Sequence, residues 1–185
     1  QKVNAFNTSA VTLAQYCYSG CSSLKEDPNF DFSNVTNAYS MYAGTTNLIK
    51  IKPTDFRKVT DAGYMFSGTG LKDISTLQFR DITNMNLFSY TSVGITHWCD
   101  FSNCNNIVGN IDYSLYCAGT DIFPNIKLGG ITVMSNLMHA TGTRMLRKIL
   151  ATGGRYSHNI SNQLLDATAL NEYFTGLGTA VGGAT

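Results

Sequence analysis

A three-residue phrase recurs near the N-terminus at fixed spacing, and this repeat constrains the fold more than any other feature. An aromatic residue, a small residue and a glycine stand together three times, and the glycines, Gly20, Gly44 and Gly68, lie 24 residues apart. A Val-Thr pair precedes each aromatic residue. A constant period of this length is typical of stacked units that bury their apolar faces only against their neighbours. The repeat therefore predicts a solenoid.

The period continues with drift as far as Ile131 and Met138. The Ile-Thr pairs at 82–83 and 131–132 are about two periods apart, so a degenerate unit is expected between them. We place it at about 93–118, with extra residues inserted within 93–110. The repeat region thus spans 1–152 and contains about six units.

Positions that stay apolar in every unit identify the predicted core. Each such position should form a ladder along the stack, because equivalent side chains of successive units lie one above another. Three ladders are predicted: Phe32, Phe56 and Phe79; Val11, Val35, Val59, Ile82 and Ile131; and Tyr18, Tyr42, Phe66, Phe88, Tyr116 and Met138.

The local pattern within a unit predicts a short helix followed by a short strand. Apolar residues three to four apart over 12–18 favour a helix, with Thr12 as its N-cap and Gly20 after its end. The alternating residues 48–51 favour a strand. The expected fold is an α/β solenoid, a leucine-rich-repeat-like stack of helix–strand units of about 24 residues with one parallel sheet.

Two segments carry a resemblance to a known family. Residues 18–24, Tyr-Ser-Gly-Cys-Ser-Ser-Leu, and 30–36, Phe-Asp-Phe-Ser-Asn-Val-Thr, resemble the BspA-like leucine-rich repeat proteins. The resemblance extends over 6–88, is loose over 93–130 and returns over 131–146. It implies cell-surface or virion attachment proteins rather than enzymes. The family's cysteine position is filled only by Cys21 here, so no cysteine ladder is expected.

The C-terminal residues 153–185 are predicted to cap the stack. A helix over about 166–176 begins with Asp166 as N-cap and ends before a glycine, Gly176. Such a helix resembles the one that closes BspA-like arrays. Because more residues usually follow it in that family, we expect the chain to be a piece of a longer protein.

The charge composition argues against several partners. The chain has 13 basic and 12 acidic residues, and 14% of its residues are charged, against a usual value of about 25%. Nucleic acid and anionic membranes are therefore not expected partners. No apolar run reaches about 18 residues, so membrane insertion is not expected either. The polar residues are mostly Asn, Thr, Ser, Gly and Tyr, which suit rigid recognition surfaces and equally the turns of a repeat.

The five cysteines, Cys17, Cys21, Cys99, Cys104 and Cys117, match no zinc-site spacing. Most are predicted to be buried free thiols, with one of Cys17 and Cys21 facing the core. Reduced cysteines fit assembly in a reducing cytosol, as for a phage particle. A bacterial surface protein remains compatible with them.

Residues for catalysis are scarce, so the chain is not expected to be an enzyme and no cofactor or metal is expected. It contains two glutamates, and Asp100 and Asp112 are the carboxylates that could meet near the irregular unit. A glycan-acting enzyme using that pair is the competing hypothesis, since glycosidases need two facing carboxylates. The histidines and cysteines of this region lack a third group to orient a Cys–His pair.

The irregular unit is the predicted binding site, because insertions in repeat proteins often form the binding face. It carries exposed-type aromatic residues that can stack on a sugar or fill a partner's pocket. The predicted ligand-binding residues are His97, Trp98, Phe101, Tyr113 and Tyr116. Trp98, the single tryptophan, could instead fill a widened core.

A second predicted contact region is a basic stretch consisting of Arg144, Arg147, Lys148 and Arg155. It could contact an acidic partner subunit or glycan, or it could simply be a solvated face. Taken together, the patterns predict a non-enzymatic recognition or structural domain of a surface appendage. The expected settings are a phage tail fibre, tail tip or capsid decoration in a virion that binds a host-surface glycan or protein, or alternatively a bacterial cell-surface adhesin.

Overall fold

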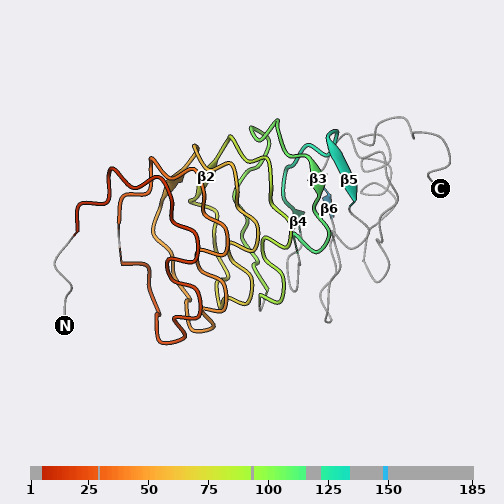
Figure 1. Cartoon of the computed structure of the whole chain (residues 1–185). Coiled ribbons are helices and arrows are strands. Elements are labelled where there is room, and N and C mark those ends of the chain that lie inside the picture. The colour runs from red at the N-terminus through yellow and green to blue at the C-terminus, as the bar shows by residue number, and fades with distance from the viewer. Residues whose placement is uncertain (1–5, 29, 93, 116–121, 134–147, 150–185) are drawn as a thin grey trace.

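The chain winds through successive turns that lie side by side along one axis (Figure 1). We call one such turn, corresponding to one sequence repeat, a coil. The computed structural model describes residues 6–28, 30–92, 94–115, 122–133 and 148–149. The predicted capping segment 153–185, with its helix over about 166–176, lies outside these residues.

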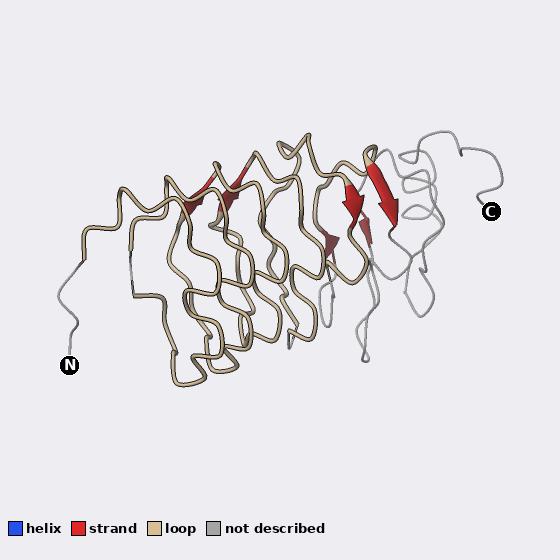
Figure 2. Cartoon of the chain, in the orientation of Figure 1, coloured by secondary structure: helices blue, strands red, loops and turns tan. Residues whose placement is uncertain are grey.

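Regular secondary structure is sparse within the described residues. Three two-stranded parallel sheets, β1–β2, β3–β5 and β4–β6, are present, and the described residues contain no helix (Figure 2). The strands are β1 (Asp55–Phe56), β2 (Gln78–Phe79), β3 (Gly109–Asn110), β4 (Ile122–Phe123), β5 (Ile131–Val133) and β6 (Lys148–Ile149). The predicted α/β solenoid of helix–strand units with one parallel sheet is therefore wrong.

The segment predicted as a helix, 12–18, instead forms linked turns whose amides alternate between two directions. The N–H groups of Ala14, Tyr16 and Tyr18 donate to carbonyls of the next coil at 2.8, 3.0 and 2.8 Å. Between them, the N–H of Cys17 donates only three residues back, to Ala14 at 3.2 Å. An α-helix requires each N–H to reach four residues back. The apolar spacing therefore reflects local turns, and half of the amides join one coil to the next.

The threonines of the Val-Thr pairs link coils rather than cap helices. Thr60 donates both its N–H and its hydroxyl to the carbonyl of Thr36, at 2.8 and 3.1 Å. Thr36 makes the same two bonds to Thr12, and Thr83 makes them to Thr60. Each repeat of this pair thus adds one backbone and one side-chain bond between neighbouring coils.

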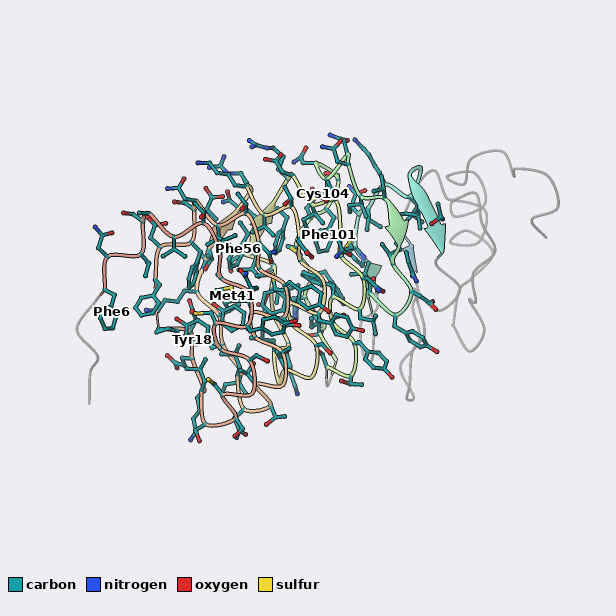
Figure 3. All side chains as sticks on the ribbon, viewed as in Figure 1. Phe6, Tyr18, Met41, Phe56, Phe101 and Cys104 are labelled. Carbon is teal, nitrogen blue, oxygen red and sulfur yellow. The ribbon has the colours of Figure 1, made fainter. Side chains whose placement is uncertain are left out.

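The predicted ladder of Phe32, Phe56 and Phe79 is confirmed. Neighbouring rings are stacked with centroids 6.0 and 5.5 Å apart, and the three side chains are at most 3% exposed. Phe101 continues the ladder 5.8 Å beyond Phe79. Figure 3 shows Phe56 and Phe101 inside the stack, with Phe6 at its N-terminal end. The β-branched ladder is also buried at Val35, Val59, Ile82 and Ile131.

The third predicted ladder is confirmed only for its first three members. Tyr18, Tyr42 and Phe66 stack with centroids 5.3 and 5.6 Å apart. At the next coil the N–H of Phe66 bonds to the carbonyl of Phe88, so that Phe88 lies beside Met65. Phe88 therefore meets Phe66 edge-on, at 5.2 Å and 90°. The remaining predicted members, Tyr116 and Met138, lie outside the described residues.

The repeated glycines are needed for their backbone conformation. Gly20, Gly44 and Gly68 have φ angles of 72°, 71° and 67°, in the left-handed region that glycine adopts without a steric penalty. Gly44 also lies close to Gly20, because a Cβ added to Gly44 would come 3.8 Å from the Gly20 backbone. The predicted positive φ is confirmed, although no helix ends there.

The cysteine prediction is confirmed in one part and wrong in the other. Cys99 and Cys104 are buried free thiols, whereas Cys17 and Cys21 are both exposed. Both exposed thiols belong to the first described coil, whose counterparts one coil later, Met41 and Thr45, are fully buried. Cys117 lies outside the described residues.

Candidate functional site

The irregular unit brings His97 and Trp98 to one edge of the stack. The N–H groups of Thr96 and His97 both donate to the carbonyl of Lys72, at 2.8 and 3.0 Å, and the carbonyl of His97 accepts from Ile74 at 2.8 Å. These bonds place His97 beside Asp73 and Trp98 beside Ile74. The Asp73 carboxylate accepts from both the N–H and the hydroxyl of Ser75, and these bonds lower the pKa of Asp73.

Trp98 serves both as core and as surface. Its side chain is half-buried and packs against the hydrophobic core. The indole Nε1 is buried and has no hydrogen-bond partner among the described residues. A buried donor without a partner is uncommon in folded proteins. The exposed part of the ring is available to a ligand.

A groove of about 440 Å³ opens beside the indole. Its walls come from three segments of the chain that are distant in sequence. The lining residues are Ser75, Thr96, His97, Trp98, Cys99, Asp100, Pro124 and Asn125. We call this the Trp98 groove. Most of its polar residues are short and neutral, so it offers hydrogen-bond donors and acceptors rather than a strong field.

A second depression of about 540 Å³ adjoins the Trp98 groove, because Ser75 and Asp100 line both. We call it the arginine trough. Its other lining residues are Arg57, Leu77, Gln78, Phe79, Arg80, Asn103 and Asn105. Together the two depressions form a continuous surface on which aromatic, amide and guanidinium groups are available.

Both arginines of the trough are held by neighbouring carboxylates. Arg57 donates through Nε and Nη2 to the two oxygens of Asp55, at 3.0 and 2.7 Å. Arg80 makes the same paired contact with Asp81, at 2.8 Å for each bond. The hydrogen bonds from Arg57 lower the pKa of Asp55, and those from Arg80 lower the pKa of Asp81. Such surface pairs contribute little stability, but they fix the direction of each guanidinium.

Asp100 has a structural role at the junction of the two depressions. One carboxylate oxygen accepts from the Ser102 N–H at 2.8 Å, and the other accepts from the Ser102 hydroxyl at 2.9 Å. Asp31 and Asp55 likewise accept from the N–H two residues ahead. This is the turn-forming use of aspartate. Among the described residues no group of three or more His, Cys, Asp or Glu side chains could hold a metal ion.

The other predicted site residues do not join this groove. Phe101 is fully buried in the phenylalanine ladder, so its predicted ligand contact is wrong. Tyr113 is half-buried and packs edge-on against Tyr90, with ring centroids 5.3 Å apart. Tyr116 lies outside the described residues, as do Arg144, Arg147 and Arg155. Lys148 is described as part of β6, where it pairs with Ile122 of β4.

Sequence reasoning missed the arginine trough and a row of tyrosines. Arg57 and Arg80 are 23 residues apart, and this repeat spacing was the signal that they lie on adjacent coils. Tyr39 packs between Tyr16 and Tyr64, with ring centroids 5.6 Å apart in both pairs. These tyrosines do not share one repeat position, so no single ladder reveals them.

Comparison with known proteins gives one partial match. Residues 1–76 match the family model described as "Mycoplasma protein of unknown function, DUF285". The match covers the first coils and ends before Trp98. No curated protein and no solved structure matches the chain. The described part of the chain also contains no helical segment suited to crossing a membrane.

Proposed function

We propose that this chain is a non-enzymatic recognition domain that binds a carbohydrate in the Trp98 groove. The observation that carries the proposal is a half-buried indole beside a groove of about 440 Å³ whose walls are mostly short and polar. An indole face can stack on the apolar face of a sugar ring. Ser75, Thr96 and Asn125 supply donors and acceptors for sugar hydroxyls.

The groove chemistry favours binding over turnover. Hydrolysis of a glycoside uses two carboxylates that face each other at roughly 5 to 9.5 Å. Among the described lining residues of the groove and the trough, Asp100 is the one acidic side chain. Both of its oxygens accept hydrogen bonds from Ser102, which supports a turn-forming role.

The setting we propose is a surface appendage that contacts a host-surface glycan or protein. The low charge and the abundance of Asn, Thr, Ser and Tyr support a rigid contact surface. The partial match to a family described as a Mycoplasma protein supports a bacterial cell surface. A virion component, such as a phage tail fibre, is the alternative setting.

A glycan array followed by fluorescence titration tests this function. Trp98 is the single tryptophan, so a ligand in the groove should change the intrinsic emission directly. His97→Ala and Asn125→Ala should weaken binding by several-fold. Ser23→Ala, an exposed position in the first coil, is the matched control and should bind as the wild type does.

Two results would contradict the proposal. Array ligands that bind equally well to the wild type and to both groove variants would place the site elsewhere. Hydrolysis of a bound glycan, abolished by Asp100→Asn or Asp112→Asn, would instead support an enzyme.

A further inference from the structure

One corner of the stack holds the backbone in the left-handed conformation in every coil. The φ angles there are 59° at Tyr16, 53° at Ser40, 56° at Tyr64, 52° at Leu87 and 53° at Tyr113. Hydrogen bonds from Tyr16 to the Tyr39 carbonyl, from Ser40 to the Gly63 carbonyl and from Tyr64 to the Asn86 carbonyl place the first four in one column. The bond from Ser89 to the Ser114 carbonyl adds Tyr113 beside Leu87. We call these five residues the corner column.

Tyrosine is an unexpected residue for this backbone. The left-handed region is accessible to glycine and asparagine and unfavourable for bulky side chains. Nevertheless the corner column carries tyrosine at Tyr16, Tyr64 and Tyr113, in alternate coils. Since the backbone conformation favours other residues there, the aromatic side chains must provide something else. An unfavourable conformation at an exposed position points from the structure towards a functional role.

The rings of the corner column are inclined to their neighbours rather than coplanar. Tyr39 meets Tyr16 at 70° and Tyr64 at 57°, and Tyr90 meets Tyr113 at 63°. Tyr16 is 59% exposed, and the other four rings are half-buried. Inclined rings form a row of notches. A flat sugar chain would instead need rings lying in one plane.

The spacing of the tyrosines matches a specific ligand geometry. Hydrogen-bonded chains lie about 4.8 Å apart, so tyrosines in alternate coils are about 9.6 Å apart. One turn of a polyproline II helix has three residues and rises about 9.3 Å. From Tyr16 to Tyr113 the column covers four steps, roughly 19 Å, which is about six residues of that helix.

We propose that the corner column binds a proline-rich peptide segment in the polyproline II conformation. Prolines three residues apart would occupy successive notches at Tyr16, Tyr64 and Tyr113. Aromatic side chains are the usual receptors for such segments, because the ligand is already extended and loses little conformational entropy. None of these tyrosines lines the Trp98 groove or the arginine trough, so this site is independent of the carbohydrate site.

The test measures fluorescence anisotropy of a labelled oligoproline of roughly nine residues, about three turns of the helix. A Gly-Ser peptide of equal length and a chito-oligosaccharide serve as comparison ligands. Tyr64→Gly removes a central ring while leaving a residue suited to the left-handed backbone, so the fold is retained. It should weaken oligoproline binding by about tenfold. Ser40→Gly makes the same backbone change one coil earlier and should leave binding unchanged.

Several outcomes would overturn the proposal. They are the absence of oligoproline binding to the wild type, equal binding of the Gly-Ser peptide, and equal loss in Tyr64→Gly and Ser40→Gly. Chito-oligosaccharide binding that depends on Tyr64, without oligoproline binding, would assign the corner column to glycans instead. Urea unfolding of both variants confirms that each is folded during the measurement.

Discussion

Replacing Phe56 with alanine should lower the free energy of unfolding by about 4 kcal/mol. Phe56 is fully buried and lies between Phe32 and Phe79, with ring centroids 6.0 and 5.5 Å away. Phe→Ala changes in cores cost about 3–5 kcal/mol, and each stacked pair contributes about 0.5–1.5 kcal/mol within such a loss. Because total stabilities are about 5–15 kcal/mol, the variant should remain folded with a much lower urea midpoint.

Urea unfolding followed by Trp98 emission and by far-ultraviolet circular dichroism measures this loss. Coincidence of the two transitions is required, because stacked repeats can unfold in parts. Phe6→Ala is the control. That side chain is 66% exposed, so the expected change is within about 0.5 kcal/mol.

Double-mutant cycles examine the order of rings in the ladder. Leucine replacements at Phe56 and Phe79 should be coupled by about 1 kcal/mol, because the two rings are in contact. Replacements at Phe56 and Phe101 should be additive, since Phe79 separates them. A loss below about 1 kcal/mol for Phe56→Ala, or equal coupling in both cycles, would refute the stacked arrangement.

Three further predictions concern backbone, thiols and pH. Gly44→Ala should cost about 1–2 kcal/mol in urea unfolding, because the φ of 71° is unfavourable for alanine; a neutral change would contradict that conformation. In the native state a thiol reagent should label the exposed Cys17, and Cys104 should react only after unfolding, because burial raises its pKa to about 12; peptide mass spectrometry distinguishes the two. Burial, and then the Asp27 carboxylate that accepts its hydroxyl hydrogen bond at 2.9 Å, holds the pKa of Tyr42 well above its ordinary 10.0. The unfolded chain then loses this proton first, so stability should fall as the pH rises above about 10, and less steeply in Tyr42→Phe.

The repeat revealed the core because burial acts on one position at a time. Phe32, Phe56 and Phe79 stand at equal spacing, and only stacking keeps such a position apolar. The helix prediction failed because apolar residues three to four apart fit both an α-helix and a series of three-residue turns. The destination of alternate amides in the next coil is a tertiary feature that a local pattern does not contain.

The candidate site was predictable only in part. The irregular spacing identified His97 and Trp98, yet it also selected Phe101, whose place in the ladder depends on an altered offset of 22 residues from Phe79. The change of register at Phe88 similarly followed from contacts with the next coil. The corner column was missed because its residues differ in type, and only their shared φ and hydrogen bonds relate them.

The alternating amides of the turn segment have a consequence for changes of chain length. Adding one residue within 36–44 would exchange the amides that reach the adjacent coil with those that bond locally, and would reverse every side chain after it. Consistent with this, the spans 12–20, 36–44 and 60–68 have the same length. The chain shortens instead after the glycine, between Gly68 and Ile74. Insertions for engineering, such as an epitope or a label, therefore belong beyond the glycine, where an odd number of residues leaves the pairing frame intact.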